Sequence, residues 1–460
     1  MVSPWRTGAS PAHTIPVNKP ASLLRILGLS FGLAVTVGNT IGGGILRTPG
    51  EIASLLPNPW LFVGIWVVGG LYALLGANAL SELGTMLPRS GGQYVFARHA
   101  FGNYAGFLVG WIDWVSTCAS TGAISLVIGE SIASILVLDH RSASALAMAI
   151  VVLFTALLMH GTRMGDRAQQ LTSLAKALAL LALVAACFIF AKRARVAAPP
   201  TVAVRAATTT MFAAFMLAAQ SVIYAYDGWS GPIYFSEELD DPARQIPRSM
   251  FYGLLGVAAI YLLINVAFLT AVPTTALAGS QLAAATVARA LFGDRGELLV
   301  RIIVIVSLPS AVNACLLMAS RVLYSVSRDG LGVPQATRVN PGGTPVVALG
   351  LSCAVALAFL ATGTFETIIA IAAFFFVADY ALSFVAVFVL RRREPNASRP
   401  YRALGHPWTT AFVLFGSLVF LASAVVADRR NSIFALGIVL ISYPVFRRTH
   451  RSPVPAPSVG

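Results

Sequence analysis

The stretch Gly-Asn-Thr-Ile-Gly-Gly-Gly at residues 38–44 interrupts the first long apolar segment of the chain, and Tyr-Asp-Gly-Trp-Ser-Gly-Pro at residues 226–232 interrupts the sixth. Glycine is costly inside a helix and proline removes a backbone donor, so we expect both helices to unwind at these points. A helix that faces lipid cannot unwind, because its freed N–H and C=O groups would have no partners. The sequence therefore predicts two broken helices that line a cavity at membrane depth.

The composition is that of a chain that crosses a membrane many times. Hydrophobic residues make up 57% of the 460 residues, charged residues only 11%, and the mean hydropathy is +0.78. A soluble globular protein carries roughly 25% charged residues. Twelve helices of about 20 residues need roughly 240 residues. We therefore expect an all-α integral membrane protein with twelve spans and no separate soluble domain.

Several classes of function find no support in the sequence. The four cysteines lie in apolar segments without CxxC spacing, and the six histidines are scattered, so we expect no metal site and no cofactor. No Ser/His/Asp arrangement and no nucleotide-binding loop indicates an enzyme. The formal net charge of +14 belongs mostly to short loops, where it orients the helices, and we expect no binding of nucleic acid.

The apolar segments set the expected spans. The third segment is too long for one straight helix, and we expect an amphipathic stretch that enters the bilayer near Gly102. The twelve expected spans are residues 29–53, 61–83, 94–136, 145–160, 170–191, 208–235, 250–271, 298–326, 346–361, 365–390, 408–426 and 432–446.

Lys and Arg residues set the expected orientation. With the amino terminus in the cytoplasm, twenty of the 32 fall in inner regions and ten in outer regions, although the outer loop at 192–205 is a basic exception. This bias favours both termini inside. We expect cytoplasmic tails at 1–24 and 448–460 and a transmembrane domain at 25–447 in the cell (inner) membrane.

The sixth segment breaks five segments after the first. An odd offset makes the two broken helices enter the membrane from opposite sides, as in the inverted 5+5 repeat of the LeuT-type fold. We expect a first repeat at about residues 25–200, a second at about 201–395 and two extra helices at about 405–447. Broken helices at matching positions of two halves point to the substrate site of a transporter.

Four motifs lie in order between about residues 28 and 395. They are the glycine motif at 38–50, Ser-Glu-Leu at 81–83 with Pro-Arg-Ser-Gly-Gly-Gln-Tyr at 88–94, Tyr-Ala-Tyr-Asp-Gly-Trp at 224–229 with the charged stretch 237–248, and Ser-Arg-Asp-Gly at 327–330. Together they resemble the amino acid–polyamine–organocation (APC) superfamily of permeases. The string at 224–229 most resembles the L-type (LAT-like) exchangers, including bacterial serine/threonine exchanger-like members. Gly43 departs from the pattern, because many relatives carry serine there.

The resemblance implies a secondary transporter that moves neutral L-amino acids by alternating access. Sodium-independent exchange is the preferred mode, and proton-coupled symport is the alternative. Polyamine transport is less favoured, because a polyamine has no carboxylate for the glycine stretch, and a non-transporting sensor is a further alternative. Nothing resembles the cysteine that links animal heteromeric exchangers to an accessory glycoprotein, so we expect the protein to act alone.

The first break offers donors to the carboxylate of an amino acid. Its backbone N–H groups lie at a helix amino terminus, where the dipole also favours an anion. Asn39 could add a side-chain contact. The alternative is that Gly38 and Gly42 form a helix packing face. The candidate binding residues are Thr40, Ile41, Gly42, Gly43 and Gly44.

The second break offers acceptors to the ammonium. The candidates are Tyr224, Ala225, Tyr226, Asp227 and Gly228. A carboxylate within a span is a functional hypothesis by default, and Asp227 either neutralises the ammonium or caps the second half-helix. Trp229 either closes over the substrate as a gate or belongs to ordinary aromatic packing.

Other polar residues lie within the spans. Lys176 either snorkels to the inner interface or, as the resemblance implies, stands where sodium sits in sodium-coupled relatives of the fold and bridges the first and eighth helices. Asn313 either faces the site or bonds a neighbouring helix. The intramembrane acids Asp113 and Asp379 are partners for buried polar groups or proton carriers, and the sequence assigns neither a role. Near the inner face we expect a gate in which Glu82, Glu237 and Glu238 pair with Arg89, Arg244 or Arg248.

Overall fold

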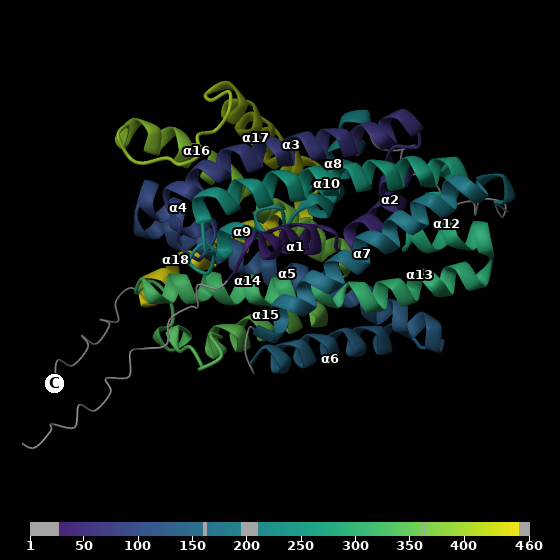
Figure 1. The fold of residues 1–460 in the computed structure, drawn as a ribbon, viewed down its shortest axis with the longest axis horizontal. Coiled ribbons are helices and arrows are strands. Elements are labelled where there is room, and N and C mark those ends of the chain that lie inside the picture. The colour runs from purple at the N-terminus through teal and green to yellow at the C-terminus, as the bar shows by residue number, and fades with distance from the viewer. Residues whose placement is uncertain (1–26, 160–162, 195–209, 363, 450–460) are drawn as a thin grey trace, which may run out of the picture.

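The structure is a computed structural model that describes residues 27–159, 163–194, 210–362 and 364–449. This part of the chain is built from helices, most of which run along one common direction, horizontal in Figure 1. Within it, β pairing is limited to two isolated bridges, Leu27 with Leu239 and Val339 with Pro345. The predicted all-α class is confirmed.

The helices follow one another with short connections. The first half contains α1 (Leu29–Thr40), α2 (Gly44–Leu55), α3 (Pro59–Met86), α4 (Gln93–Phe101), α5 (Asn103–Leu136), α6 (His140–Met159), α7 (Arg163–Phe190), α8 (Met211–Tyr226) and α9 (Gly231–Tyr234). The second contains α10 (Pro242–Ala271), α11 (Thr274–Leu277), α12 (Ala283–Phe292), α13 (Asp294–Ser307), α14 (Pro309–Arg328), α15 (Val346–Thr362), α16 (Phe365–Arg393), α17 (Trp408–Ala427) and α18 (Arg429–Thr449).

The long helices make this a multi-pass membrane protein. In the described residues, nine helices are long and apolar enough to cross a membrane, where α1 with α2 and α13 with α14 each count as one. Shorter apolar helices at Leu174–Phe190, Met211–Tyr226 and Val346–Ala361 coincide with the expected fifth, sixth and ninth spans. The count of twelve spans stays a prediction.

Both expected interruptions are present. The first separates α1 from α2 between Thr40 and Gly44, and the second separates α8 from α9 between Tyr226 and Gly231. In Figure 1, α1 lies to the left of α2, whereas α8 lies to the right of α9. The two broken segments therefore run in opposite directions, as the odd offset between them predicts.

Other helix limits reflect local chemistry. The third segment divides at Gly102, where φ is 93°, a conformation that favours glycine. The eighth divides into α13 and α14 before Pro309, which has no N–H to donate. The seventh begins at Pro242 and not near residue 250 as expected, because Asp241 accepts a hydrogen bond from the Arg244 N–H at 3.3 Å and caps the helix.

The core lies around the two breaks. α1 packs against α7, α10 and α14, while α2 packs against α8, and α5 packs against α14 and α16. Bulky side chains such as Trp66, Trp229 and Tyr261 are buried there. The outer helices α17 and α18 instead expose large apolar side chains, including Phe415 and Leu440. This pattern suits a helix bundle whose outside meets lipid.

Candidate functional site at the junction of the broken helices

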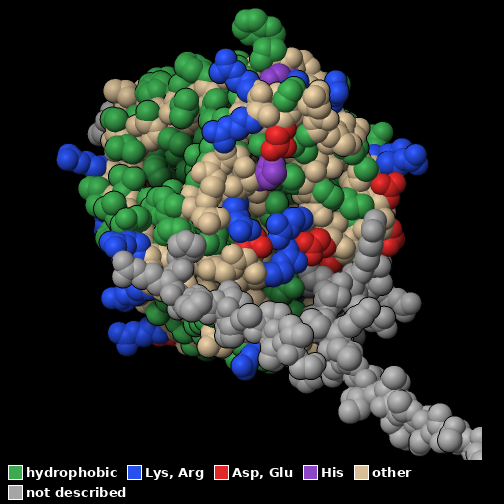
Figure 2. Space-filling view, turned by 90° about the vertical axis from the view of Figure 1, so that its left-hand side faces the viewer, with side chains coloured by type: hydrophobic (Ala, Val, Ile, Leu, Met, Phe, Trp, Pro, Cys, Tyr) green, Lys and Arg blue, Asp and Glu red, His purple; other side chains and the backbone are tan. Residues whose placement is uncertain are grey.

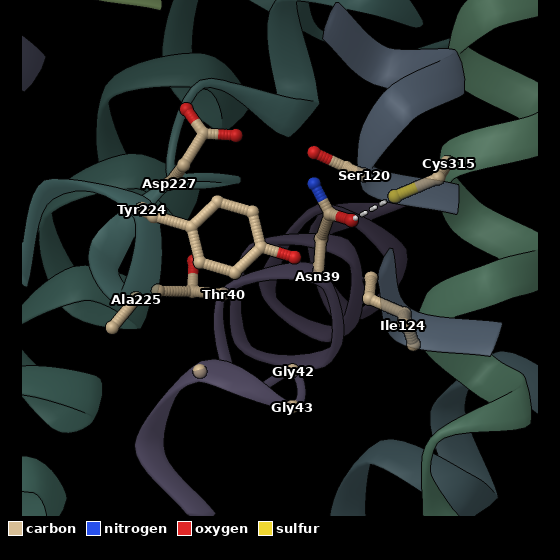
Figure 3. Close-up of a pocket in the computed structure, with 11 residues that line it drawn as sticks. Asn39, Thr40, Gly42, Gly43, Ser120, Ile124, Tyr224, Ala225, Asp227 and Cys315 are labelled. Atoms are coloured by element: carbon tan, nitrogen blue, oxygen red, sulfur yellow. Dashed lines mark hydrogen bonds between the residues drawn. The ribbon is translucent and has the colours of Figure 1, made fainter. Parts of the chain in front are cut away.

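A cavity of about 20 Å³ lies where the two breaks meet (Figure 3). A buried water needs roughly 10–15 Å³ of this kind of volume. The cavity therefore holds about one water molecule in this conformation and must widen to admit an amino acid. Its lining comes from the first break (Asn39, Thr40, Gly42, Gly43, Gly44), the second break (Tyr224, Ala225, Asp227), α5 (Ser120, Ile124) and α14 (Cys315).

Glycines bring the two breaks into backbone contact. A Cβ atom on Gly44 would lie 2.7 Å from the Cα of Ala225, and one on Gly228 would lie 2.9 Å from the backbone N of Thr40. The φ of Gly228 is also 108°, which strains any other residue. A side chain at either position would push the two broken helices apart.

The first break presents donors to the cavity. The first N–H groups of a helix have no acceptor within that helix, and no side chain caps α2 at Gly43. The Thr40 hydroxyl is buried without a hydrogen-bond partner. Of the predicted carboxylate-binding residues, Thr40 and the three glycines line the cavity, whereas Ile41 does not.

The second break presents acceptors. The Asp227 carboxylate lines the cavity and accepts a hydrogen bond from the Tyr380 hydroxyl. No side chain caps α9, so Asp227 does not play the capping role that the sequence left open. The Tyr261 hydroxyl lies 2.9 Å from the Ala225 carbonyl oxygen and 2.6 Å from that of Thr40, and so ties the two breaks together.

Three predicted residues of the second break lie outside the cavity lining. Tyr226 turns toward α3, where its hydroxyl donates to the Trp66 carbonyl oxygen at 3.1 Å. Trp229 is buried against Tyr380, with ring centroids 4.8 Å apart. Gly228 serves the contact between the breaks. These placements match the packing alternative for Trp229, and a gating role stays a prediction.

Lys176 is buried in the bundle and does not snorkel. Its ammonium donates to the Gly38 carbonyl oxygen at 2.9 Å and to the Ile41 carbonyl oxygen at 2.7 Å. These acceptors lie at the carboxyl end of α1, where the helix dipole favours a cation. Among the described hydrogen bonds of Lys176 none reaches the eighth span, so the expected bridge to that span is not seen.

The eighth span reaches the first break through sulfur-containing side chains instead. The Cys315 thiol donates to Asn39 Oδ1 at 3.2 Å, and Asn39 Nδ2 donates to Met318 Sδ at 3.4 Å. Asn313 is half-buried and does not line the cavity. Two residues along a helix turn a side chain by about 200°, so Asn313 and Cys315 face different ways.

Sequence reasoning missed Ser120, Ile124 and Cys315. The small polar residues of the third span, Ser-Thr-Cys-Ala-Ser-Thr-Gly at 116–122, are the signal that could have indicated a face close to the cavity. Ser120 is buried, and its hydroxyl has no hydrogen-bond partner. It therefore remains available to a ligand.

Ion pairs close one end of the bundle. Figure 2 shows this end, the left side of Figure 1, where basic and acidic side chains gather. Glu237 binds Arg328 through contacts of 2.8 and 2.9 Å, and Glu238 binds the buried Arg321 through two contacts of 3.2 Å. Glu82 accepts from Arg391 at 2.8 Å. The acids are paired as expected, but mostly with other arginines.

The arginines that the sequence proposed bind elsewhere. Arg89 binds Asp329 at 3.0 Å and lies 4.0 Å from Glu237, and Arg244 pairs with its neighbour Asp241 at 3.7 Å. Burial opposes ionisation of Asp329, but Arg89 and Arg98 outweigh it and lower the pKa of this carboxyl below its usual value. The gate partners come from distant helix ends, which spacing along the sequence does not reveal.

Comparisons with known proteins agree with this geometry. The amino acid permease family model matches residues 22–443. The chain is 28% identical over 431 residues to the serine/threonine exchanger SteT of Bacillus subtilis (strain 168), which covers 92% of this chain and 96% of that protein. It is 27% identical over 394 residues to the b(0,+)-type amino acid transporter 1 of Mus musculus, with 84% and 80% covered. It is 28% identical over 392 residues to the large neutral amino acids transporter small subunit 2 of Homo sapiens, with 83% and 72% covered.

Proposed function

Because the chain belongs to the amino acid permease family, we propose that it is a secondary transporter that exchanges neutral L-amino acids across the cell (inner) membrane by alternating access. The family and the similar proteins are transporters and not enzymes. Similarity to a serine/threonine exchanger and to a transporter of large neutral amino acids supports neutral substrates and the exchange mode. The basic inner loops support cytoplasmic termini.

The observation that carries this proposal is the polarity of the cavity. One wall is the amino-terminal end of α2, which suits a carboxylate. The other wall carries the Asp227 carboxylate, which suits an ammonium. A zwitterionic amino acid matches both walls, whereas a polyamine would leave the first wall without an anion.

The conformation suits a transporter between its two open states. The inner end is closed by the ion pairs of Glu237 and Glu238. Toward the other end, Arg47 of α2 pairs with Glu130 of α5 beside a second cavity of about 120 Å³. Alternating access requires these two sets of contacts to break in turn while the central cavity widens.

Lys176 supports independence from sodium. Its ammonium already occupies the carbonyl oxygens of Gly38 and Ile41, which are the kind of ligands that a hard cation prefers. A fixed cation at the end of α1 leaves a sodium ion without these two ligands. Coupling to sodium at this point is therefore not expected.

The test is uptake of radiolabelled neutral amino acids into proteoliposomes without sodium. We expect strong stimulation when unlabelled amino acid is present inside, and no stimulation by added sodium. Net uptake into empty vesicles, driven by an inward proton gradient, would instead show a symporter. Binding without any flux would show a sensor, and flux of putrescine without flux of neutral amino acids would show a polyamine transporter.

A further inference from the structure

Two buried carboxyl groups lie outside the substrate cavity without a basic partner. Asp113 of α5 and Asp379 of α16 are each 2% exposed, and the two helices pack together. The charge of Asp113 acts on Asp379. Asp113 Oδ2 and Asp379 Oδ1 are both buried without a hydrogen-bond partner. The transport account given above uses neither group.

The surroundings of the pair are acidic or neutral. The Tyr234 hydroxyl, at the end of α9, donates to Asp113 Oδ1 at 2.8 Å, and the Thr117 hydroxyl lies 3.5 Å from the same oxygen. The other titratable groups that act on the pair or feel its charge are Asp227, Tyr380 and Cys118. No Lys, Arg or His of the described chain forms an ion pair with either acid.

Two negative charges cannot both persist in such a place. An unpaired charge in a low-dielectric interior is very costly, and neighbouring carboxylates then share a proton. A proton held between Asp113 and Asp379 would reduce the charge of the pair from −2 to −1. It would also supply the donor that their two unpartnered oxygen atoms lack.

We propose that Asp113 and Asp379 form a proton-binding site, and that its occupancy favours closure of the inner side of the transporter through Tyr234 of α9. Tyr234 lies three residues before Glu237, whose ion pair with Arg328 closes the inner end. When the inner side opens, water reaches the pair and hydrates the second charge. The closed state therefore binds the proton more tightly than the open state, and by linkage the proton favours closure.

The direct test is infrared spectroscopy of the purified protein at about pH 8, where an ordinary aspartate is ionised. Asp379→Asn leaves one carboxyl in the pair, with charge −1 and no shared proton. We expect the wild type to show the C=O band of a protonated carboxyl, and Asp379→Asn to lose it. The exposed-site variant Asp241→Asn should keep the band. A wild type without the band, or a band that persists in Asp379→Asn, would overturn the proposal.

Exchange provides a second readout, which rests on the proposed function. Raising the pH from about 6 to about 9 should slow wild-type exchange about tenfold, as expected when a required proton is lost. In Asp379→Asn the ratio of the two rates should approach one, and Asp379→Glu should restore the dependence. A parallel pH profile in Asp379→Asn would contradict the site. A wild type that exchanges nothing at either pH would count against the proposed function, and the infrared band would still decide on the proton.

Discussion

The ammonium of Lys176 lies 2.7 Å from the carbonyl oxygen of Ile41, inside the break of the first helix. It thereby fixes the carboxyl end of α1 beside the glycines that line the cavity. The fifth span and the first break are joined by this cation, so the shape of the carboxylate-binding wall depends on it.

Replacing Lys176 with alanine should reduce exchange by at least about tenfold, because two buried carbonyl groups lose their donor and the break loses its anchor. Exchange in proteoliposomes, normalised to reconstituted protein, measures this. Lys192→Ala, which removes an exposed lysine beyond the same helix, is the matched control. Equal kinetics for both variants would argue that Lys176 has no part in transport.

Gly228→Ala should destabilise the protein by about 1–3 kcal/mol, since it combines a φ of 108° with a clash against the first break. Gly256→Ala is the control, because no atom lies within 4 Å of its Cβ position. Thermal denaturation in detergent compares them. A Gly228→Ala protein as stable as the control would show that the breaks can separate at little cost.

Asp227→Asn should weaken binding of a neutral amino acid by about tenfold, because an amide keeps an acceptor for Tyr380 but no longer balances the charge of an ammonium. Equilibrium binding of the radiolabelled substrate measures the change. Unaltered affinity would mean that backbone carbonyl groups alone hold the ammonium.

Arg321→Ala should cost about 3–5 kcal/mol of stability, because it leaves the buried Glu238 without its partner. Arg244→Ala, which removes an exposed pair with Asp241, should cost less than about 1 kcal/mol. Thermal denaturation of both proteins supplies the comparison. Similar losses in the two variants would contradict a buried closing contact.

The inner contact of Asp329 should resist mild acid. Folding lowers the pKa of this carboxyl, so the contact stabilises the closed end above the usual aspartate pKa of about 4 and is lost only as the pH falls through the lowered value. Between about pH 5 and pH 8, thiol labelling of Ser325→Cys behind this contact should stay slow. Asp329→Asn should speed the labelling across that whole range, and faster labelling of the single variant at pH 5 would contradict the account.

The two breaks could be predicted because glycine and proline announce them locally, in residues 38–44 and 226–232. Lys176 stood out because a charge within a span is costly. Cys315 and Ser120 could not be found in this way, since they lie in regular helices and only packing decides which face meets the cavity. The same reason explains the choice of Asn313 over Cys315.

The ion pairs show a second limit. Arg328 and Arg321 reach Glu237 and Glu238 from the far end of α14, some 80 to 90 residues along the chain. Nearby arginines such as Arg244 were the natural partners by spacing, but that residue turns to its own helix cap. Long-range pairing depends on how helix ends meet, which composition and periodicity do not encode.

The most direct test of the central claim, that the junction of the two breaks binds the amino acid, is equilibrium binding of a radiolabelled neutral amino acid to purified Gly42→Leu. Gly42 lines the cavity, and a leucine side chain there would fill its 20 Å³. Gly64→Leu, at a position with no atom within 4 Å of the added Cβ, is the control. The account predicts that Gly64→Leu binds like the wild type and that Gly42→Leu does not bind. Wild-type affinity in a folded Gly42→Leu protein would contradict it.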